Sequence, residues 1–183
     1  MEDLSLHLLD IMENSLDARA GRIEVRIDED PDADLLTLEI LDDGKGMDAE
    51  TVKKVTDPFF TTRKTRRFGL GLSMLSESAK ATGGKLEVVS APGKGTRVRV
   101  VFRQSHIDMK PFGDIAQTLI TIIAAHPRIE LRYHHTIGAQ SFCFDTREIM
   151  SESGELPMDS PLILRRIEEH IRESLEELEG VKK

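Results

Sequence analysis

The sequence predicts an α/β protein, because helical and strand periodicities follow one another along a chain of 183 residues. Apolar residues recur with helical spacing over residues 4–16, whereas residues 22–27 and 35–42 alternate between apolar and polar side chains as strands do. The apolar fraction of 39% suffices for a buried core, and one Tyr and no Trp make that core mainly aliphatic. The length fits one large domain, or a domain with a small appended unit.

Turn residues separate the elements of the first half of the chain. The stretch DDGKGM interrupts the pattern after the strand at 35–42, and residues 48–56 are expected to form a short helix. A helix over 71–81 should end at Gly83-Gly84, where glycine allows the chain to leave the helix. KLEVVS and TRVRVVF then form two strands of a hairpin joined by APGKG.

We place a domain boundary near Gln104, so that residues 1–104 and residues 105–183 form two units. In the second unit we expect a helix over 112–123, a hairpin made of IELRYHH and QSFCFD, and a last helix that begins at Ser160-Pro161. The second unit is therefore a small α+β domain of unknown role. The apolar side of its last helix could pack on its own hairpin, or bind a partner or a second copy of the chain. This apolar seam consists of Leu164, Ile167, Ile171, Leu175 and Leu178.

The net charge of −8 argues against nucleic acid or an anionic membrane as the main partner, and leaves a protein partner, with a homodimer open. The single cysteine, Cys143, excludes an intrachain disulfide and fits a reducing cytoplasm. Its alternation with Phe142 and Phe144 predicts a small packed side chain. The start MEDLSLHLL lacks the basic region of a signal peptide, and the apolar run at 115–125 is too short to span a bilayer. We therefore expect a soluble cytoplasmic protein.

Asp42 is the first candidate for a ligand contact. It shares the strand face of the apolar residues of 35–42, so its carboxylate points toward the core side. A carboxylate in that place needs hydrogen-bond donors. It could cap the next turn, or it could accept from the amino group of adenine, with Gly44 and Gly46 leaving room for a flat ligand. Met47 is either an ordinary core side chain or a contact for one face of the ring.

The stretch GLGL predicts an anion site, because Gly69 and Gly71 stand directly before a helix whose first N–H groups and dipole attract negative charge. Four basic residues precede it, namely Arg63, Lys64, Arg66 and Arg67. This basic run could be a solvated loop, a nucleic-acid patch or part of a phosphate site. The acidic net charge and the lack of interleaved aromatic residues disfavour nucleic acid. A triphosphate, held together with Mg²⁺, would explain both the glycines and the charges.

The first helix carries a narrow polar stripe, formed by Asp3, His7, Asp10, Asn14 and Asp17. The stripe is either the solvated face of a surface helix or one wall of a nucleotide site. Asn14 offers an amide oxygen to Mg²⁺, and Asp10 places a carboxylate one turn earlier, near the same point. Asp10 is therefore the candidate catalytic residue, which would orient an attacking group and accept its proton.

Five motifs resemble, in their order and spacing, those of the GHKL superfamily, which includes histidine kinases, DNA gyrase, the mismatch-repair ATPase MutL and a heat-shock chaperone. ENSLDA is similar to the N-box, DDGKGM to the G1 box, DPFFTTRK to the F-box, GLGLSM to the G2 box and GKGT to the final glycine motif. They cover about residues 1–104. The resemblance implies a two-layer α/β sandwich with a mixed sheet, which holds ATP between its helical layer and a lid of residues 57–70.

On this resemblance, Asn14 would bind Mg²⁺, Asp42 would bind the adenine amino group, and Lys64 would face the phosphates. The other residues expected at the nucleotide site are Asp17, Gly44, Gly46, Met47, Thr62, Gly69, Leu70, Gly71, Leu72 and Thr96. Two departures stand out. Asp10 occupies the place of a Glu that is one methylene longer in many members, and RFGLGL replaces the GTGLGL of histidine kinases, which should stiffen the lid.

Three functions remain open. The F-box favours a kinase-like phosphotransferase that acts in trans on a protein partner, and this is the function we expect. The carboxylate that precedes the N-box Asn favours a slow ATPase whose nucleotide state alters the affinity for a partner. The third function is an ATP-sensing module that docks through residues 105–183 without turnover.

Overall fold

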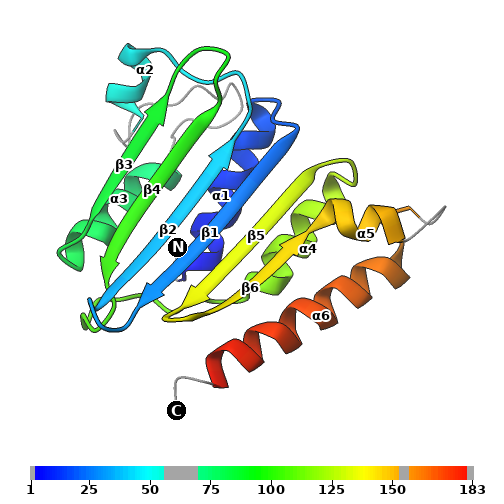
Figure 1. Ribbon diagram of the computed structural model, residues 1–183. Helices are drawn as coiled ribbons and strands as arrows, with labels where there is room; N and C mark the ends of the chain where they lie inside the picture. Colours follow the sequence, from blue (N-terminus) through cyan, green and yellow to red (C-terminus); the bar gives the residue numbers. More distant parts are fainter. Residues whose placement is uncertain (1–2, 56–69, 153–156, 181–183) are drawn as a thin grey trace.

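The protein is described by a computed structural model over residues 3–55, 70–152 and 157–180, and it has an α/β fold built on one six-stranded sheet (Figure 1). The strand order is β3-β4-β2-β1-β5-β6. Neighbouring strands are antiparallel except β1 and β5, which are parallel, so the predicted mixed sheet is confirmed. The strands are β1 (Arg22–Asp30), β2 (Leu35–Asp42), β3 (Lys85–Ser90), β4 (Thr96–Arg103), β5 (Glu130–Ile137) and β6 (Gln140–Asp145).

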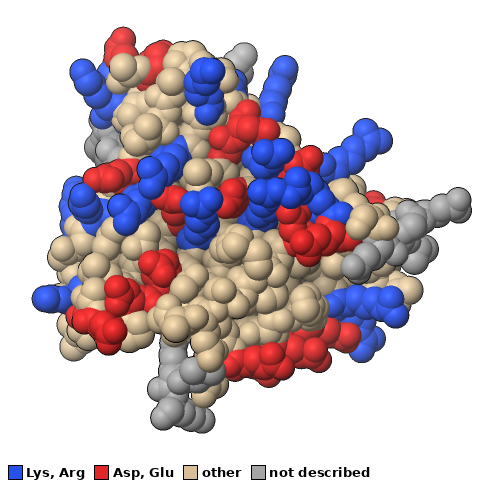
Figure 2. Space-filling view, viewed as in Figure 1, with Lys and Arg blue, Asp and Glu red and all other residues tan. Residues whose placement is uncertain are grey.

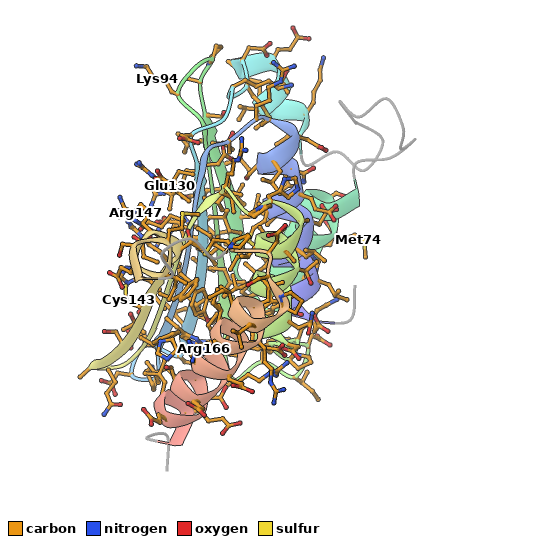
Figure 3. All side chains as sticks on the ribbon, turned by 90° about the vertical axis from the view of Figure 1, so that its right-hand side faces the viewer. Met74, Lys94, Glu130, Cys143, Arg147 and Arg166 are labelled. Carbon is orange, nitrogen blue, oxygen red and sulfur yellow. The ribbon has the colours of Figure 1, made fainter. Side chains whose placement is uncertain are left out.

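Within the described residues, helices α1, α3 and α4 cover one face of this sheet and leave the other face open, as Figures 1 and 3 show. Helices α1 and α3 pack on each other, and α4 lies between α1 and α6. No helix in the described ranges is both long and apolar enough to cross a membrane. The helices are α1 (Leu4–Asp17), α2 (Ala49–Lys54), α3 (Leu70–Ala81), α4 (Ile115–Ala125), α5 (Thr146–Glu152) and α6 (Pro161–Gly180).

The core lies between the sheet and the helical layer. The alternation predicted for β2 is confirmed, because Leu36, Leu38 and Ile40 are buried on the side that faces the helices. One continuous cluster of buried apolar residues includes side chains from both sides of residue 104. The apolar side of α6 packs within its own chain, against α4 and β6. Of the two alternatives for this seam, the intramolecular one is therefore observed.

Three local predictions need correction. Helix α4 begins at Ile115 rather than at 112, because the Asp114 side chain accepts a hydrogen bond from the Gln117 N–H and caps the helix there. Helix α5 was not predicted and follows β6 directly. Cys143 is exposed rather than packed, because it points to the open face while the neighbouring Phe144 fills the core.

The sheet and the helical layer both continue through the predicted boundary near Gln104. Strand β5 pairs with β1 along eight residues of each strand, from Arg22–Glu130 to Glu29–Ile137. The segment before α4 also holds the start of α1, because the Leu4 N–H donates to the Pro111 carbonyl (3.0 Å) and the next N–H donates to the Phe112 carbonyl (2.8 Å). Whether residues 1–104 fold independently remains a prediction.

Truncation after Gln104 tests this boundary. It would expose the edge of β1 and the side of α1 that packs on α4, so we expect the melting temperature to fall by at least about 5 °C. ATP affinity of the folded fragment should remain within a few-fold, since every predicted site residue precedes residue 104. Thermal unfolding and calorimetry measure the two effects. An unchanged melting temperature would establish two independent units, and complete loss of binding by a folded fragment would place part of the site beyond residue 104.

The polar stripe of α1 does not share one environment. Asp3 caps the helix by accepting from the Leu6 N–H, and Asp17 is exposed at the other end. His7, between them, is only 1% exposed, and within the described residues neither of its ring nitrogens has a hydrogen-bond partner. Burial, reinforced by the charge of Lys110, lowers the pKa of His7 from 6.5 to about 4.

The buried His7 predicts a loss of stability in mild acid. In the unfolded chain this imidazole binds a proton near pH 6.5, but in the folded chain only near pH 4, so protonation favours unfolding as the pH falls through that window. Above pH 6.5 His7 is neutral in both states and does not reduce the free energy of unfolding. As the pH falls to 4, protonation of His7 in the unfolded chain reduces the free energy of unfolding by up to about 3 kcal/mol. His7→Leu should reduce the difference between urea unfolding free energies at pH 7 and pH 5. The exposed His126→Gln serves as control, and an unchanged difference in His7→Leu would contradict the prediction.

Candidate functional site

Asp42 stands at the end of β2, opposite Thr96 of β4, and three donors fix its carboxylate. Its Oδ1 accepts from the N–H groups of Gly44 (2.9 Å) and Thr96 (3.2 Å), and its Oδ2 accepts from the hydroxyl of Ser15 (2.9 Å). A carboxylate has about four acceptor positions, so these bonds leave one of them on Oδ2. The backbone of the G1 loop thus orients Asp42 and leaves room for one further donor. Of the two alternatives for Asp42, the capping of the turn is therefore observed, and the contact with adenine stays a prediction.

Ser15 is a site residue that sequence reasoning missed. It lies on α1 and is 3% exposed, and its hydroxyl also lies 3.2 Å from the Ile11 carbonyl oxygen. The signal was present in the sequence, because Ser15 continues the buried line of Leu8 and Ile11 and Met12. A hydroxyl on such a line needs a partner across the interface. That partner is Asp42, which joins α1 to the end of β2.

The glycines of DDGKGM allow close packing of the backbone against neighbouring segments. A Cβ on Gly44 would lie 2.9 Å from the Ala18 carbonyl oxygen, and one on Gly46 (φ +67°) would lie 1.9 Å from the Ala91 carbonyl oxygen. The Lys45 N–H donates to the Ala18 carbonyl, and the Lys45 carbonyl accepts from the Gly93 N–H. The loop that follows Asp42 is therefore hydrogen-bonded on one side to the end of α1 and on the other to the β3–β4 hairpin.

Asp10, Asn14 and the start of α3 come together on the helical layer. The Asn14 Nδ2 donates to Asp10 Oδ2 (3.3 Å). Gly71, in the first turn of α3, lies against the same carboxylate, since a Cβ there would be 1.6 Å from Asp10 Oδ2. Because the amide nitrogen of Asn14 points to Asp10, its amide oxygen is the atom available to a hard cation such as Mg²⁺. The residues of this corner therefore fit a cation and an anion at the start of α3.

The remaining predicted site residues have varied environments. Thr96 places its Oγ1 3.0 Å from the Ser90 hydroxyl, which also accepts the Met47 N–H. Met47 is half-buried, Leu72 is buried, and Asp17 is exposed and joins none of the contacts above. Leu70 begins α3. Thr62, Lys64, Gly69 and the other basic residues of the predicted lid lie outside the described residues.

The site thus combines helix α1 with Asp10 and Asn14, strand β2 that ends at a fixed Asp42, and helix α3 with Gly71 in its first turn, within an α/β sandwich. Residues 2–106 match the family described as histidine kinase-, DNA gyrase B- and HSP90-like ATPase, which is more than half of the chain. The protein therefore belongs to this family of GHKL-type ATPases. The predicted family, and with it the predicted GHKL-type ATP-binding domain, are confirmed by this match.

Several curated relatives with this similarity are named as sensor proteins or sensor kinases. A putative sensor protein of Shewanella frigidimarina is 44% identical over 39% of this chain, and sensor histidine kinase YxdK of Bacillus subtilis is 36% identical over 39%. The aligned segments make up only 11% and 23% of the two relatives, so most of each relative has no counterpart here.

A solved structure supports the fold over a longer stretch. The N-terminal domain of a DNA repair protein superposes with a TM-score of 0.55 at 18% identity, covering 79% of this chain and 52% of the other. At this identity the likeness concerns the fold alone. Its coverage exceeds the share that residues 2–106 contribute, so it includes part of the second half of the chain.

Proposed function

We propose that the protein is a kinase-like phosphotransferase that binds Mg-ATP and acts in trans on a protein partner. The observation that carries the proposal is the oriented carboxylate of Asp42, with one acceptor position left on Oδ2. Adenine presents a matching amino donor. The names of the curated relatives, which are sensor kinases, support transfer to a protein over simple binding.

Each residue of the corner around α3 has a distinct role in this proposal. The Asn14 amide oxygen would hold Mg²⁺, which neutralises phosphate charge when bound. The first N–H groups of α3, beside Gly71, would bind phosphate oxygens. Asp10 would orient the attacking hydroxyl and accept its proton, and its contact with Gly71 keeps the carboxylate beside that helix end.

A second candidate is a slow ATPase or ATP-sensing switch that regulates its partner without phosphorylating it. The favouring observation is the link between α1 and the second half of the chain. The Pro111 and Phe112 carbonyls accept the first free N–H groups of α1, and α4 packs beside it. A shift of α1 on nucleotide binding would therefore reach residues 105–183 directly.

Incubation with γ-labelled ATP and Mg²⁺ separates the candidates. In our proposal, label appears on a protein isolated by pull-down in the presence of ATP, and Asp10→Asn slows this transfer roughly 10²-fold or more. Steady phosphate release by the protein alone, without labelled partner, would favour the ATPase. Tight ATP binding with neither product would favour the sensing module. Absence of ATP binding would overturn all three.

A further inference from the structure

We infer that the open face of the sheet is a docking surface for an acidic protein segment. Figure 2 shows Lys and Arg side chains gathered in a band across the middle of this face. We call its arginines the guanidinium belt. The belt consists of Arg22, Arg26, Arg97, Arg99, Arg132 and Arg147.

Strand register places most of the belt in two adjacent rows across the sheet. In one row, Glu39 of β2 stands opposite Arg99 of β4 on one side and Arg26 of β1 on the other. In the next row, Arg97 on β4 lies beside β2, and Arg132 on β5 lies beside β1. Side chains two residues apart on a strand share a face, so both rows point away from the helices.

Two carboxylates of this face lie beneath guanidinium groups, whereas Glu130 beside Arg22 is 39% exposed. Glu39 contacts both Arg26 (3.5 Å) and Arg97 (2.7 Å), and Asp145 contacts both Arg132 (2.9 Å) and Arg147 (2.7 Å). The Glu39 and Asp145 side chains are only 11% and 12% exposed, whereas those of Arg26, Arg97 and Arg147 are 44–51% exposed. The atoms that a partner would meet first are therefore cationic.

The belt is positive on a molecule that is otherwise acidic. Its six arginines face five carboxylates, those of Glu24, Glu39, Glu87, Glu130 and Asp145, and Glu87 is also paired with Lys85, so that the six arginines, Lys85 and these carboxylates carry a formal charge of +2. The whole chain carries −8. Figure 3, which views the sheet edge-on, shows Glu130 and Arg147 on the side away from α1 and α3. The belt is therefore a local site of opposite sign, separate from the helical layer that carries Asp10 and Asn14.

The geometry favours carboxylate ligands of a protein. Each guanidinium has five N–H donors in a planar fork, and the internal carboxylates engage only part of them. Carboxylates of an approaching segment can accept the rest in charge-assisted pairs. A nucleic acid would meet the repulsion of the −8 chain and of the carboxylates inside the belt along its whole length. A short acidic segment, in contrast, would contact only the belt and would avoid the acidic remainder of the surface.

A fluorescent poly-L-glutamate peptide is the probe. We expect the full chain to bind it at low ionic strength, and the double variant Arg26→Gln/Arg147→Gln to bind at least about tenfold more weakly. The matched control is Arg165→Gln/Arg166→Gln on α6, which removes the same charge from exposed side chains outside the belt. The control should retain affinity within about twofold.

Equal weakening in both double variants would overturn the inference, because the peptide would then sense only net charge. So would the lack of binding at low salt, or tighter binding of single-stranded DNA of matched charge. Melting temperature and ATP binding are measured for each variant. Both should be unchanged in the belt variants. A loss of peptide binding with unchanged ATP binding is then assigned to the belt and not to the nucleotide site. If Arg26→Gln unfolds the chain, Arg22→Gln/Arg147→Gln serves the same test.

Discussion

Asp42→Asn should weaken ATP binding at least about tenfold while leaving the fold intact. The reason is the orientation that the neighbours impose on the new amide. Two backbone N–H groups, from Gly44 and Thr96, point at Oδ1, so the amide oxygen must take that place. The NH₂ group then occupies the place of Oδ2, where it faces the adenine amino group donor to donor. Mispaired buried polar groups cost about 1–3 kcal/mol.

Calorimetric titration with Mg-ATP measures this loss, and Ser15→Ala is its matched control. The control removes the Ser15 hydroxyl bond to Oδ2 but keeps the carboxylate and its two backbone donors. We expect a loss of only a few-fold, because the acceptor remains in place. Unchanged affinity in Asp42→Asn would remove Asp42 from the adenine site. Equal losses in both variants would indicate that the position of α1, rather than the acceptor, controls binding.

Asp10→Asn should lower turnover roughly 10²-fold or more and preserve Mg-ATP binding, since a lost general base has effects of this size. The substitution keeps the side chain's shape beside Gly71, and its amide oxygen can still accept from Asn14. Only the proton acceptor is lost. Turnover is followed as phosphate release or as label transfer to the partner, and binding by calorimetry.

Asn14→Ala provides the contrasting variant. It removes the amide oxygen proposed for Mg²⁺ together with the bond to Asp10, so binding and turnover should fall together. A manganese titration would show the metal's share of this loss. If Asp10→Asn turns over ATP at the original rate, Asp10 belongs to a structural contact between α1 and α3 and has no role in proton transfer.

Local sequence patterns predicted most elements well, because each carried its own start and stop signals. Strand β2 was predicted at 35–42 as observed, and the helix at 71–81 begins one residue earlier. The end of β1 was predicted less well. The strand pattern was recognised only over 22–27, but residues 28–30 extend the strand, because pairing with both β2 and β5 stabilises a segment of weak strand propensity.

In the candidate site too, local patterns predicted some features, and contacts between distant segments decided others. Motif spacing pointed to Asp10, Asn14 and Asp42, since each lies at a fixed place on a helix or a strand end. The contact of Ser15 with Asp42 joins residues 27 positions apart and depends on how α1 crosses the sheet. The tight packing of Gly46 on the Ala91 carbonyl likewise depends on the β3–β4 hairpin. Neither contact has a local sequence signal strong enough to identify its partner.

By itself, the sequence determined the order of the helices and strands other than α5, the GHKL motifs and the family. These features depend on residue type and on spacing along a single segment. Tertiary structure alone decided that residues after 104 continue the same sheet through β5, that His7 leaves the polar stripe for a buried place, and that arginines of three strands and of α5 form one belt. Each depends on which distant segments pair, and pairing is fixed by the burial of the whole core rather than by any one stretch of the chain.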